Sequence, residues 1–265
     1  MQRKERLDQL LVTRGLVRSR AEATRLILAG LVRVGGERVD KTGRAVAVGA
    51  PVEVKAVSPF VSRGGDKLAH ALDAFGIAVE GRTCVDVGAS TGGFTHCLVA
   101  RGARLVYAVE VGAGQLDLRF RTHPRVVVME KTNARFLAPS AFATPPDLAT
   151  VDVSFISLEK VLPAIFGILA GLREVVALVK PQFEVGRSQV GKRGVVRDPL
   201  LHRAVLLRVI RFAQGQGWPL VGLTISPLRG PKGNREFFLH LSPGRPGLSD
   251  PEAIIAQAVD GGAEA

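Results

Sequence analysis

Residues 82–95 read RTCVDVGASTGGFT, and this stretch decides the fold of the larger part of the chain. Residues 84–87 have the composition of a short buried strand, residues 88–93 form a glycine-rich turn, and residues 94–101 have the pattern of a helix. A strand, a glycine turn and a helix in this order open the ligand crevice of a doubly wound α/β sheet. Glycines let the backbone approach a ligand, and free N–H groups at the helix start favour an anionic group.

The spacing of the glycines narrows the ligand class. A dinucleotide-binding turn follows the pattern G-x-G-x-x-G, whereas this turn places Gly88, Gly92 and Gly93 behind Asp86. The resulting D-x-G-x-x-x-G-G form resembles motif I of S-adenosylmethionine (SAM) methyltransferases. A tight strand-to-helix turn that binds no ligand is the alternative.

Polar side chains follow the next two predicted strands. Residues 105–109 form a strand that ends at Glu110, the place where this architecture holds a pair of ribose hydroxyls. Asn133 follows the strand-like residues 125–129, in a loop that lies beside the adenine in such sheets. On spacing alone, Glu110 is equally well explained as a surface charge and Asn133 as a turn residue.

Two further strands end in charged residues. Residues 151–155 end a fourth strand, and the β-branched residues 174–179 form a fifth. Ligands of open α/β sheets bind outside the carboxyl ends of the strands, so we expect Asp152 and Lys180 to share one crevice. The alternative for Lys180 is a solvated lysine at a strand end.

Residues 1–58 predict a separate small α+β domain. A first helix ends at Gly15, and Ser19 with Glu22 predicts a capping box for a second helix over residues 20–29. Short strands are expected over residues 31–34, 37–39 and 52–55.

The charge of the chain indicates a polyanionic partner. The formal net charge is +12 and the sequence pI is about 10.6. Residues 1–58 hold 12 Lys or Arg and 6 Asp or Glu, so half of the excess lies in about a fifth of the chain. Nucleic acid is the simplest partner, and a basic face kept for solubility is the alternative.

The N-terminal stretch resembles a known RNA-binding domain. Residues 6–36, RLDQLLVTRGLVRSRAEATRLILAGLVRVGG, are similar to the alpha-L RNA-binding motif shared by ribosomal small-subunit protein four and several pseudouridine synthases. The resemblance implies docking on structured RNA through shape and phosphate contacts.

The resemblance extends over nearly the whole chain. Five motifs in order look like the TlyA family: SRGGDKL (62–68), DVGASTGGFT (86–95), VDVSFISL (151–158), LVKPQFEVG (178–186) and GNREFFL (233–239). That family joins the RNA-binding domain to an FtsJ-type SAM-dependent methyltransferase. The resemblance implies a Rossmann-like α/β sheet with helices on both faces, SAM as cofactor, and methylation of the ribose 2′-OH of cytidine in ribosomal RNA.

FtsJ-type enzymes carry a catalytic Lys-Asp-Lys-Glu set, which the resemblance places at Lys67, Asp152, Lys180 and Glu236. A ribose 2′-OH is a poor nucleophile and is deprotonated as it attacks the methyl group. A lysine can accept that proton only if burial or a second cation lowers its pKa. We therefore predict Lys180 as the base and Lys67 as the neighbouring cation that helps to position the hydroxyl. Asp152 would orient the ammonium groups, and Glu236 would hold the set in place.

The resemblance also implies a cofactor site. Glu110 stands where the family often has Asp, and its longer side chain is expected still to reach the ribose. The predicted cofactor-binding residues are Asp86, Gly88, Ala89, Ser90, Gly92, Gly93, Phe94, Glu110, Asn133 and Asp152.

Two regions are predicted to bind RNA. Residues 185–198 form a glycine-rich basic loop directly after the Lys180 motif, and we expect a mobile flap that grips the RNA backbone. A flexible surface loop without a ligand is the alternative. The predicted RNA-binding residues are Arg6, Arg14, Arg18, Arg20 and Arg25 in the first domain and Lys192 and Arg193 in the loop.

These predictions divide the chain into four parts. We expect an RNA-binding domain over residues 1–58, a linker over 59–63, a methyltransferase domain over 64–246, and a C-terminal helix and tail over 247–265. The expected protein is a cytoplasmic monomer that acts on ribosomal RNA or ribosomal subunits.

Other functional classes fit the sequence less well. The longest apolar run, residues 161–172, is shorter than the roughly 20 residues of a membrane span, and no His/Cys cluster has metal-ligand spacing. A base N-methyltransferase would show two prolines after Asp152, and Cys84 and Cys97 look like core residues rather than nucleophiles. A membrane-active haemolysin and an RNA-binding scaffold with an inactive methyltransferase fold stay as alternatives.

Overall fold

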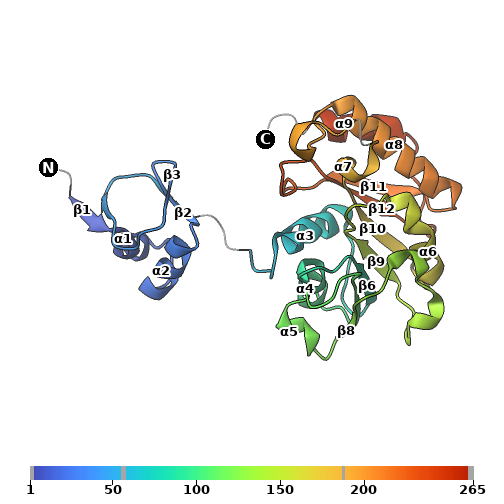
Figure 1. The fold of residues 1–265 in the computed structure, drawn as a ribbon, viewed down its shortest axis with the longest axis horizontal. Coiled ribbons are helices and arrows are strands. Elements are labelled where there is room, and N and C mark those ends of the chain that lie inside the picture. The colour runs from blue at the N-terminus through green and yellow to red at the C-terminus, as the bar shows by residue number, and fades with distance from the viewer. Residues whose placement is uncertain (1–2, 55–57, 187–188, 262–265) are drawn as a thin grey trace. The chain divides into compact units, whose positions relative to one another are not determined.

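The computed structural model describes residues 3–54, 58–186 and 189–261, apart from the side chain of Lys192. The chain divides into two compact units, Met1–Ser58 and Pro59–Ala265 (Figure 1). Each unit has its own apolar core.

The N-terminal unit combines two helices with short strands. Its elements are β1 (Lys4–Arg6), α1 (Leu7–Thr13), α2 (Arg20–Leu28), β2 (Val32–Val34), β3 (Glu37–Val39), β4 (Ala45–Ala47) and β5 (Val52–Val54). Strand β2 lies between β3 and β5 in an antiparallel sheet, and β1 pairs with β4. The apolar faces of α1 and α2 are buried against each other and against Val32, Val39 and Val46.

The second helix begins as predicted, with one difference. The Ser19 hydroxyl accepts a hydrogen bond from the Glu22 N–H at 3.2 Å. The Glu22 carboxylate accepts the N–H of Arg18 at 2.8 Å, one residue before the partner that a capping box uses. Strands β1 and β4, which pair with each other, were not predicted.

The C-terminal unit contains a seven-stranded sheet in the order β11-β12-β10-β9-β6-β7-β8. Strands β8, β7, β6, β9 and β10 are parallel, and β12 runs antiparallel to both β10 and β11. The strands are β6 (Thr83–Val87), β7 (Leu105–Val109), β8 (Val126–Met129), β9 (Leu148–Val151), β10 (Glu174–Val179), β11 (Leu220–Ile225) and β12 (Phe237–Leu241).

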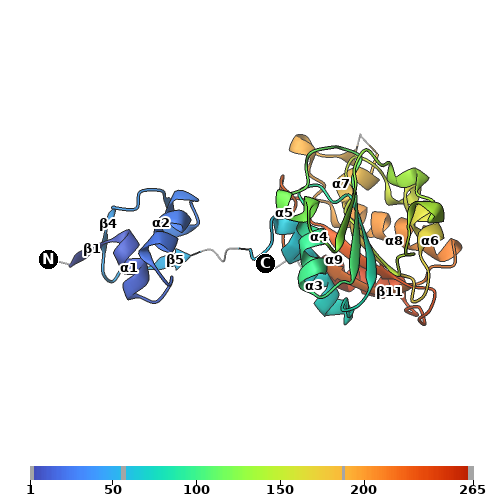
Figure 2. The ribbon, with the colours of Figure 1, turned by 90° about the horizontal axis from the view of Figure 1, so that it is seen from below.

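Helices cover both faces of this sheet, as predicted. Figure 2 shows α3 and α4 on one side of the strands and α6 and α8 on the other. Helix α9 packs on α8 through the buried Ile255 and Val259. The helices are α3 (Arg63–Phe75), α4 (Gly93–Ala100), α5 (Leu118–Arg121), α6 (Leu162–Ile168), α7 (Pro181–Glu184), α8 (Pro199–Gly215) and α9 (Pro251–Asp260), with 3₁₀ turns η1 (Ala134–Phe136), η2 (Pro139–Ala141), η3 (Leu158–Lys160) and η5 (Lys192–Gly194).

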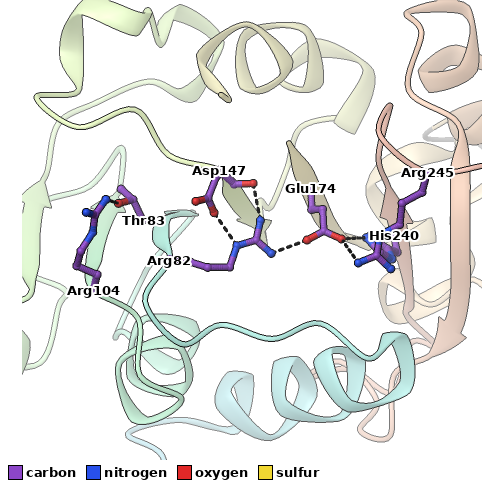
Figure 3. A network of polar contacts seen from close by, with 7 residues as sticks. All are labelled: Arg82, Thr83, Arg104, Asp147, Glu174, His240 and Arg245. Atoms are coloured by element: carbon purple, nitrogen blue, oxygen red, sulfur yellow. Dashed lines mark hydrogen bonds and ion pairs between the residues drawn. The ribbon is translucent and has the colours of Figure 1, made fainter. Parts of the chain in front are cut away.

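A buried polar network joins the strands at their amino edge (Figure 3). Arg82 lies just before β6 and donates to the Asp147 carboxylate at 2.6 Å, to the Asp147 carbonyl at 2.7 Å and to Glu174 at the start of β10. Glu174 also pairs with His240 and Arg245, each at 3.0 Å. Burial alone would raise the pKa of Glu174, but hydrogen bonds from His240 and Arg82 outweigh it and lower the pKa to about 2. The network therefore fixes the edge of the sheet opposite to the strand ends that carry Asp152 and Lys180.

The structure differs from the predicted linker over residues 59–63. Phe60 and Val61 pack against the core of the second unit, and Arg63 already belongs to α3. Among the described residues, no helix is long and apolar enough to cross a membrane, and no cluster of His, Cys, Asp and Glu side chains could hold a metal ion.

Candidate active site

Two adjoining cavities lie at the carboxyl ends of β6, β9 and β10. One has a volume of about 470 Å³ and is lined by Lys67, Lys180 and most of the glycine loop. The other has about 480 Å³ and is lined by Glu110, Asn133 and the strand end after β9. Both contain Gly88, Ser90 and Asp152 in their walls, so the glycine loop and Asp152 separate two connected compartments.

The glycines of the loop are required by close packing. Gly88 has a φ of +87°, and a Cβ on it would lie 2.5 Å from the carbonyl oxygen of Asp152. Gly92 has a φ of +92°, and its Cβ would lie 2.8 Å from a methyl group of Leu116. Any other residue at these two positions would combine backbone strain with a steric clash.

Asp86 supports the loop from below. Its fully buried carboxylate accepts a hydrogen bond from Thr95 at 2.7 Å and a longer one from Thr150 at 3.4 Å, and it lines neither cavity. Burial raises the pKa of Asp86 to about 7 despite the hydrogen bond from Thr95, and repulsion by Asp152 adds to this rise. Of the residues predicted to bind the cofactor, Asp86 therefore positions the loop rather than facing a cavity.

The second cavity presents a fixed carboxylate. One oxygen of Glu110 accepts the N–H of Ser90 at 3.0 Å and the other accepts the N–H of Gly112 at 2.9 Å. Asn133 lines the same cavity, and its carbonyl oxygen accepts the N–H of Arg135 at 3.1 Å. Asn133 thus begins the turn η1, as the alternative expected, and it also borders the cavity.

The four predicted catalytic residues form two ion pairs. Lys67 Nζ lies 2.5 Å from Glu236 Oε2, and both side chains are buried. Lys180 Nζ lies 2.6 Å from Asp152 Oδ1 and donates a hydrogen bond of 2.9 Å to Ser154 Oγ. Each lysine therefore has its own carboxylate, whereas the sequence suggested that Asp152 would orient both ammonium groups. Lys67 and Lys180 line the same 470 Å³ cavity.

An exposed aromatic residue borders the site and was not predicted. The Phe155 side chain is 89% exposed, its φ is +63°, and its ring centroid lies 4.8 Å from that of Phe183. The Phe183 ring in turn lies 5.8 Å from Lys180 Nζ. Sequence patterns place phenylalanine in the core, so only its place at a strand end could have pointed to this residue.

The loop that carries Phe155 is held by one buried carboxylate. Glu184 accepts hydrogen bonds of 2.7 Å from the Ser157 hydroxyl and from the Leu158 N–H, and Arg208 donates to it at 3.0 Å. Burial raises the pKa of Glu184 against these hydrogen bonds. Glu184 therefore ties the loop after β9 to α7.

In the N-terminal unit, a residue that the sequence analysis missed organises two of the predicted arginines. The buried Asp8 pairs with Arg6 at 3.0 Å and with Arg20 at 2.8 Å. The hydrogen bond from Arg6 lowers the pKa of Asp8 to about 2, against the effect of burial. Arg14 donates to the Val48 carbonyl, and the predicted residues Arg18 and Arg25 are exposed.

The basic loop is anchored at its C-terminal end. Asn234 accepts the N–H of Val196 and donates to the carbonyl of Gly194, both at 2.9 Å. Arg193 is exposed and has a φ of +68°. The side chain of Lys192 lies outside the described residues. Asn234 therefore holds residues 194–196, the described C-terminal end of the loop.

The cysteines behave as core residues. Cys84 and Cys97 are fully buried in the core between the sheet and α3 and α4, and burial raises the pKa of each thiol to about 12. Neither thiol is a nucleophile at neutral pH.

Comparison with known proteins places this geometry in a family. FtsJ-like methyltransferases match residues 60–242, and the S4 domain matches residues 5–52. The chain belongs to the FtsJ-like methyltransferase family. Within this family, it is 52% identical over 243 residues to the 16S/23S rRNA (cytidine-2′-O)-methyltransferase TlyA of Mycobacterium tuberculosis, which covers 91% of each protein.

Two further relatives carry another label. Hemolysin A of Brachyspira hyodysenteriae is 42% identical over 236 residues, 89% of this chain and 98% of that protein. A solved hemolysin-labelled chain from Streptococcus thermophilus is 44% identical and superposes with a TM-score of 0.75, over 98% of this chain and 97% of that one. The likeness to these two hemolysin-labelled proteins extends over 89% and 98% of this chain.

Proposed function

We propose that the protein binds SAM in the two connected cavities and methylates the ribose 2′-OH of cytidine in ribosomal RNA. The observation that carries the proposal is the Lys180–Asp152 ion pair, which opens into the same cavity as the glycine loop. The name of the Mycobacterium tuberculosis relative supports the substrate, and the S4 domain with its exposed arginines supports binding of structured RNA.

The residues present fit SAM. The Glu110 carboxylate, fixed by two backbone N–H groups, would accept the ribose hydroxyls, and Asn133 would lie near the adenine. The glycine loop would face the methionine part, in the cavity that also contains both lysines. Each cavity has a volume in the usual range for small-molecule sites. When bound, SAM supplies an electrophilic methyl group.

The chain contributes positioning and a proton acceptor. Lys180 Nζ, as a neutral amine, would take the proton of the 2′-OH on its lone pair and become an ammonium group, which Asp152 and Ser154 hold in place. Lys67, held by Glu236, would place a second positive charge in the cavity and help to position the hydroxyl. No covalent link between enzyme and RNA is needed.

The exposed ring of Phe155 and the half-buried ring of Phe183, beside Lys180, would hold the target base. Phe155 and Phe183 offer an aromatic surface next to the lysine, and an unstacked base can stack on such a surface. In the N-terminal unit, Asp8 would hold Arg6 and Arg20 ready for phosphate contacts.

Methyl transfer to unmodified ribosomal subunits tests the proposal. Lys180→Ala is expected to lower turnover about 10²–10⁴-fold, the usual contribution of a general base, with unchanged SAM affinity in calorimetry. Lys160→Ala, which removes an exposed lysine from η3, serves as the matched control and is expected to stay active. Near-normal turnover of Lys180→Ala, or methylation of an RNA whose target ribose lacks the 2′-OH, contradicts the proposal.

A further inference from the structure

A third cavity, which is strongly basic, adjoins the candidate active site. It has a volume of about 380 Å³, and its walls include Arg197, Arg229, Lys232 and Arg235. Arg229 also lines the 470 Å³ cavity that contains the catalytic lysines, so the two cavities are neighbours. No acidic side chain is among the described residues that line the basic cavity. Four cations therefore line one space whose described walls contain no carboxylate, although Asp260 attracts Arg235 from outside the lining.

Two of the lining residues contain buried polar atoms without partners. Arg235 donates to the Val259 carbonyl at 2.9 Å through Nη1, but its Nε and Nη2 are buried and form no hydrogen bond with any described residue. His202 is 1% exposed; its Nε2 donates to the Val196 carbonyl at 3.0 Å, and its buried Nδ1 has no partner. Unsatisfied buried groups are costly and rare in folded proteins. The two unpaired N–H groups of Arg235 point to a ligand that carries acceptor atoms, whereas His202 Nδ1 has a free lone pair and would accept from a donor.

Two charged side chains at the rim of the cavity also lack ion-pair partners among the described residues. The side chains of Arg197 and Lys232 are exposed and form no ion pair with the described residues. Burial lowers the pKa of Arg235, and repulsion by Arg229 adds to this shift. An anion in the cavity would relieve this repulsion.

The walls are held in place by the core. Asn234, which is 2% exposed, fastens the segment around Val196 through two hydrogen bonds, and His202 binds the Val196 carbonyl from α8. The cavity is thus formed by fixed elements, so its cations are arranged before a ligand arrives.

We propose that this cavity binds a backbone phosphate of the RNA strand next to the target nucleotide. The inference rests on the proposed function, because it takes RNA as the substrate. A phosphodiester carries one negative charge and free oxygens, which arginine and lysine bind well. Because the basic cavity lies beside the catalytic cavity, a phosphate bound in it would fix the RNA strand on one side of the target ribose. Arg197 belongs to the basic loop over residues 185–198, so the cavity includes the end of that loop, and the S4 domain then acts at other points of the RNA.

Salt dependence of methylation tests the assignment. The double variant Arg197→Gln/Lys232→Gln removes two exposed charges, and Arg211→Gln removes an exposed charge paired with Glu252, away from the cavity. The KM for in-vitro transcribed 16S and 23S rRNA is measured between 50 and 300 mM KCl at constant magnesium. Loss of one neutralised phosphate should lower the slope of log KM against log salt by about 0.7–0.9 and raise KM roughly tenfold. SAM affinity in calorimetry should not change.

The outcomes separate the two proposals. If the unaltered protein is active but the double variant has the same salt slope as Arg211→Gln, the phosphate site is refuted and the proposed function is not. This result is expected if the cavity holds a small free anion instead of the RNA backbone. Absence of methyl transfer by the unaltered protein on any rRNA or subunit overturns the proposed function and this inference with it. A lowered slope with unchanged SAM affinity supports the site.

Discussion

Replacing Gly88 by alanine tests how the glycine loop and the catalytic strand end depend on each other. The new Cβ would lie 2.5 Å from the carbonyl oxygen and 2.9 Å from the carbonyl carbon of Asp152, which are backbone atoms that cannot rotate away. The φ of +87° adds strain of about 1–2 kcal/mol, and overpacking adds about 1–3 kcal/mol. Relief of the clash requires a shift of Asp152, which orients Lys180. We therefore expect loss of both stability and activity.

Gly76→Ala provides the matched control. Gly76 ends α3 with a φ of +62°, and no atom lies within 4 Å of the position of its Cβ. This variant has backbone strain but no clash, so the difference between the two variants isolates the contact with Asp152. The clash alone should destabilise Gly88→Ala by about 2 kcal/mol, the middle of the overpacking range. Gly88→Ala should therefore melt about 4–8 °C below Gly76→Ala in a unit of this size.

Thermal unfolding and methyl transfer are measured on the same preparations. We expect Gly76→Ala to keep its turnover, and Gly88→Ala to lose at least about 100-fold, because a misplacement of about 1 Å has this effect on catalysis. Equal melting temperatures together with an active Gly88→Ala variant would refute the reasoning.

Two further predictions concern stability and the exposed aromatic surface. The pKa of Glu174 is about 2 in the folded chain and 4.5 in the unfolded chain. The ion pairs of Glu174 therefore stabilise the fold fully above pH 4.5, and this stabilisation is lost as the pH falls from 4.5 towards 2. Urea unfolding should show Glu174→Gln as less stable than the unaltered protein at pH 7. The difference in their free energies of unfolding should be smaller by about 2 kcal/mol at pH 3. A difference that does not change with pH contradicts this. Phe155→Ala should melt normally but lose about 5- to 100-fold in kcat/KM for RNA, which is the effect of losing one stacked base. Phe136→Ala, which removes another exposed phenylalanine, should keep its kcat/KM.

The sequence predicts the sheet and the place of the site because both depend on local signals. A buried strand followed by a glycine turn is recognisable in a single window, and the rule for strand ends then brings distant residues together. Lys67 and Glu236 are 169 positions apart, and only the resemblance to a family related them before the structure was known. Their pairing and that of Asp152 with Lys180 were not predictable, because spacing says nothing about which carboxylate faces which lysine.

Other features depend on contacts that leave no pattern in the sequence. Asp8 looks like an ordinary first-turn acid of a helix, yet it is buried and holds two arginines. Arg82 and Glu174 look like surface charges at strand starts, but they form a buried network because the edge of a parallel sheet collects the starts of several strands. Burial of charge is decided by partners from distant segments, so composition and periodicity do not show it.

The two ion pairs of the proposed catalytic set differ in what they connect, and this difference supports the roles proposed for them. Lys67 and Glu236 are 10% and 1% exposed, and their pair joins α3 to the start of β12. Breaking such a buried pair leaves an unpaired charge in the core, at a cost of about 3–5 kcal/mol. Lys180 and Asp152 join neighbouring strand ends. Lys180 is 12% exposed, close to the 10% of Lys67, but Asp152 is 23% exposed, so water can reach the carboxylate of this pair. A group that exchanges a proton in every turnover needs that access, whereas a fixed charge does not. The geometry therefore favours Lys180 as the proton acceptor and Lys67 as the fixed positive charge.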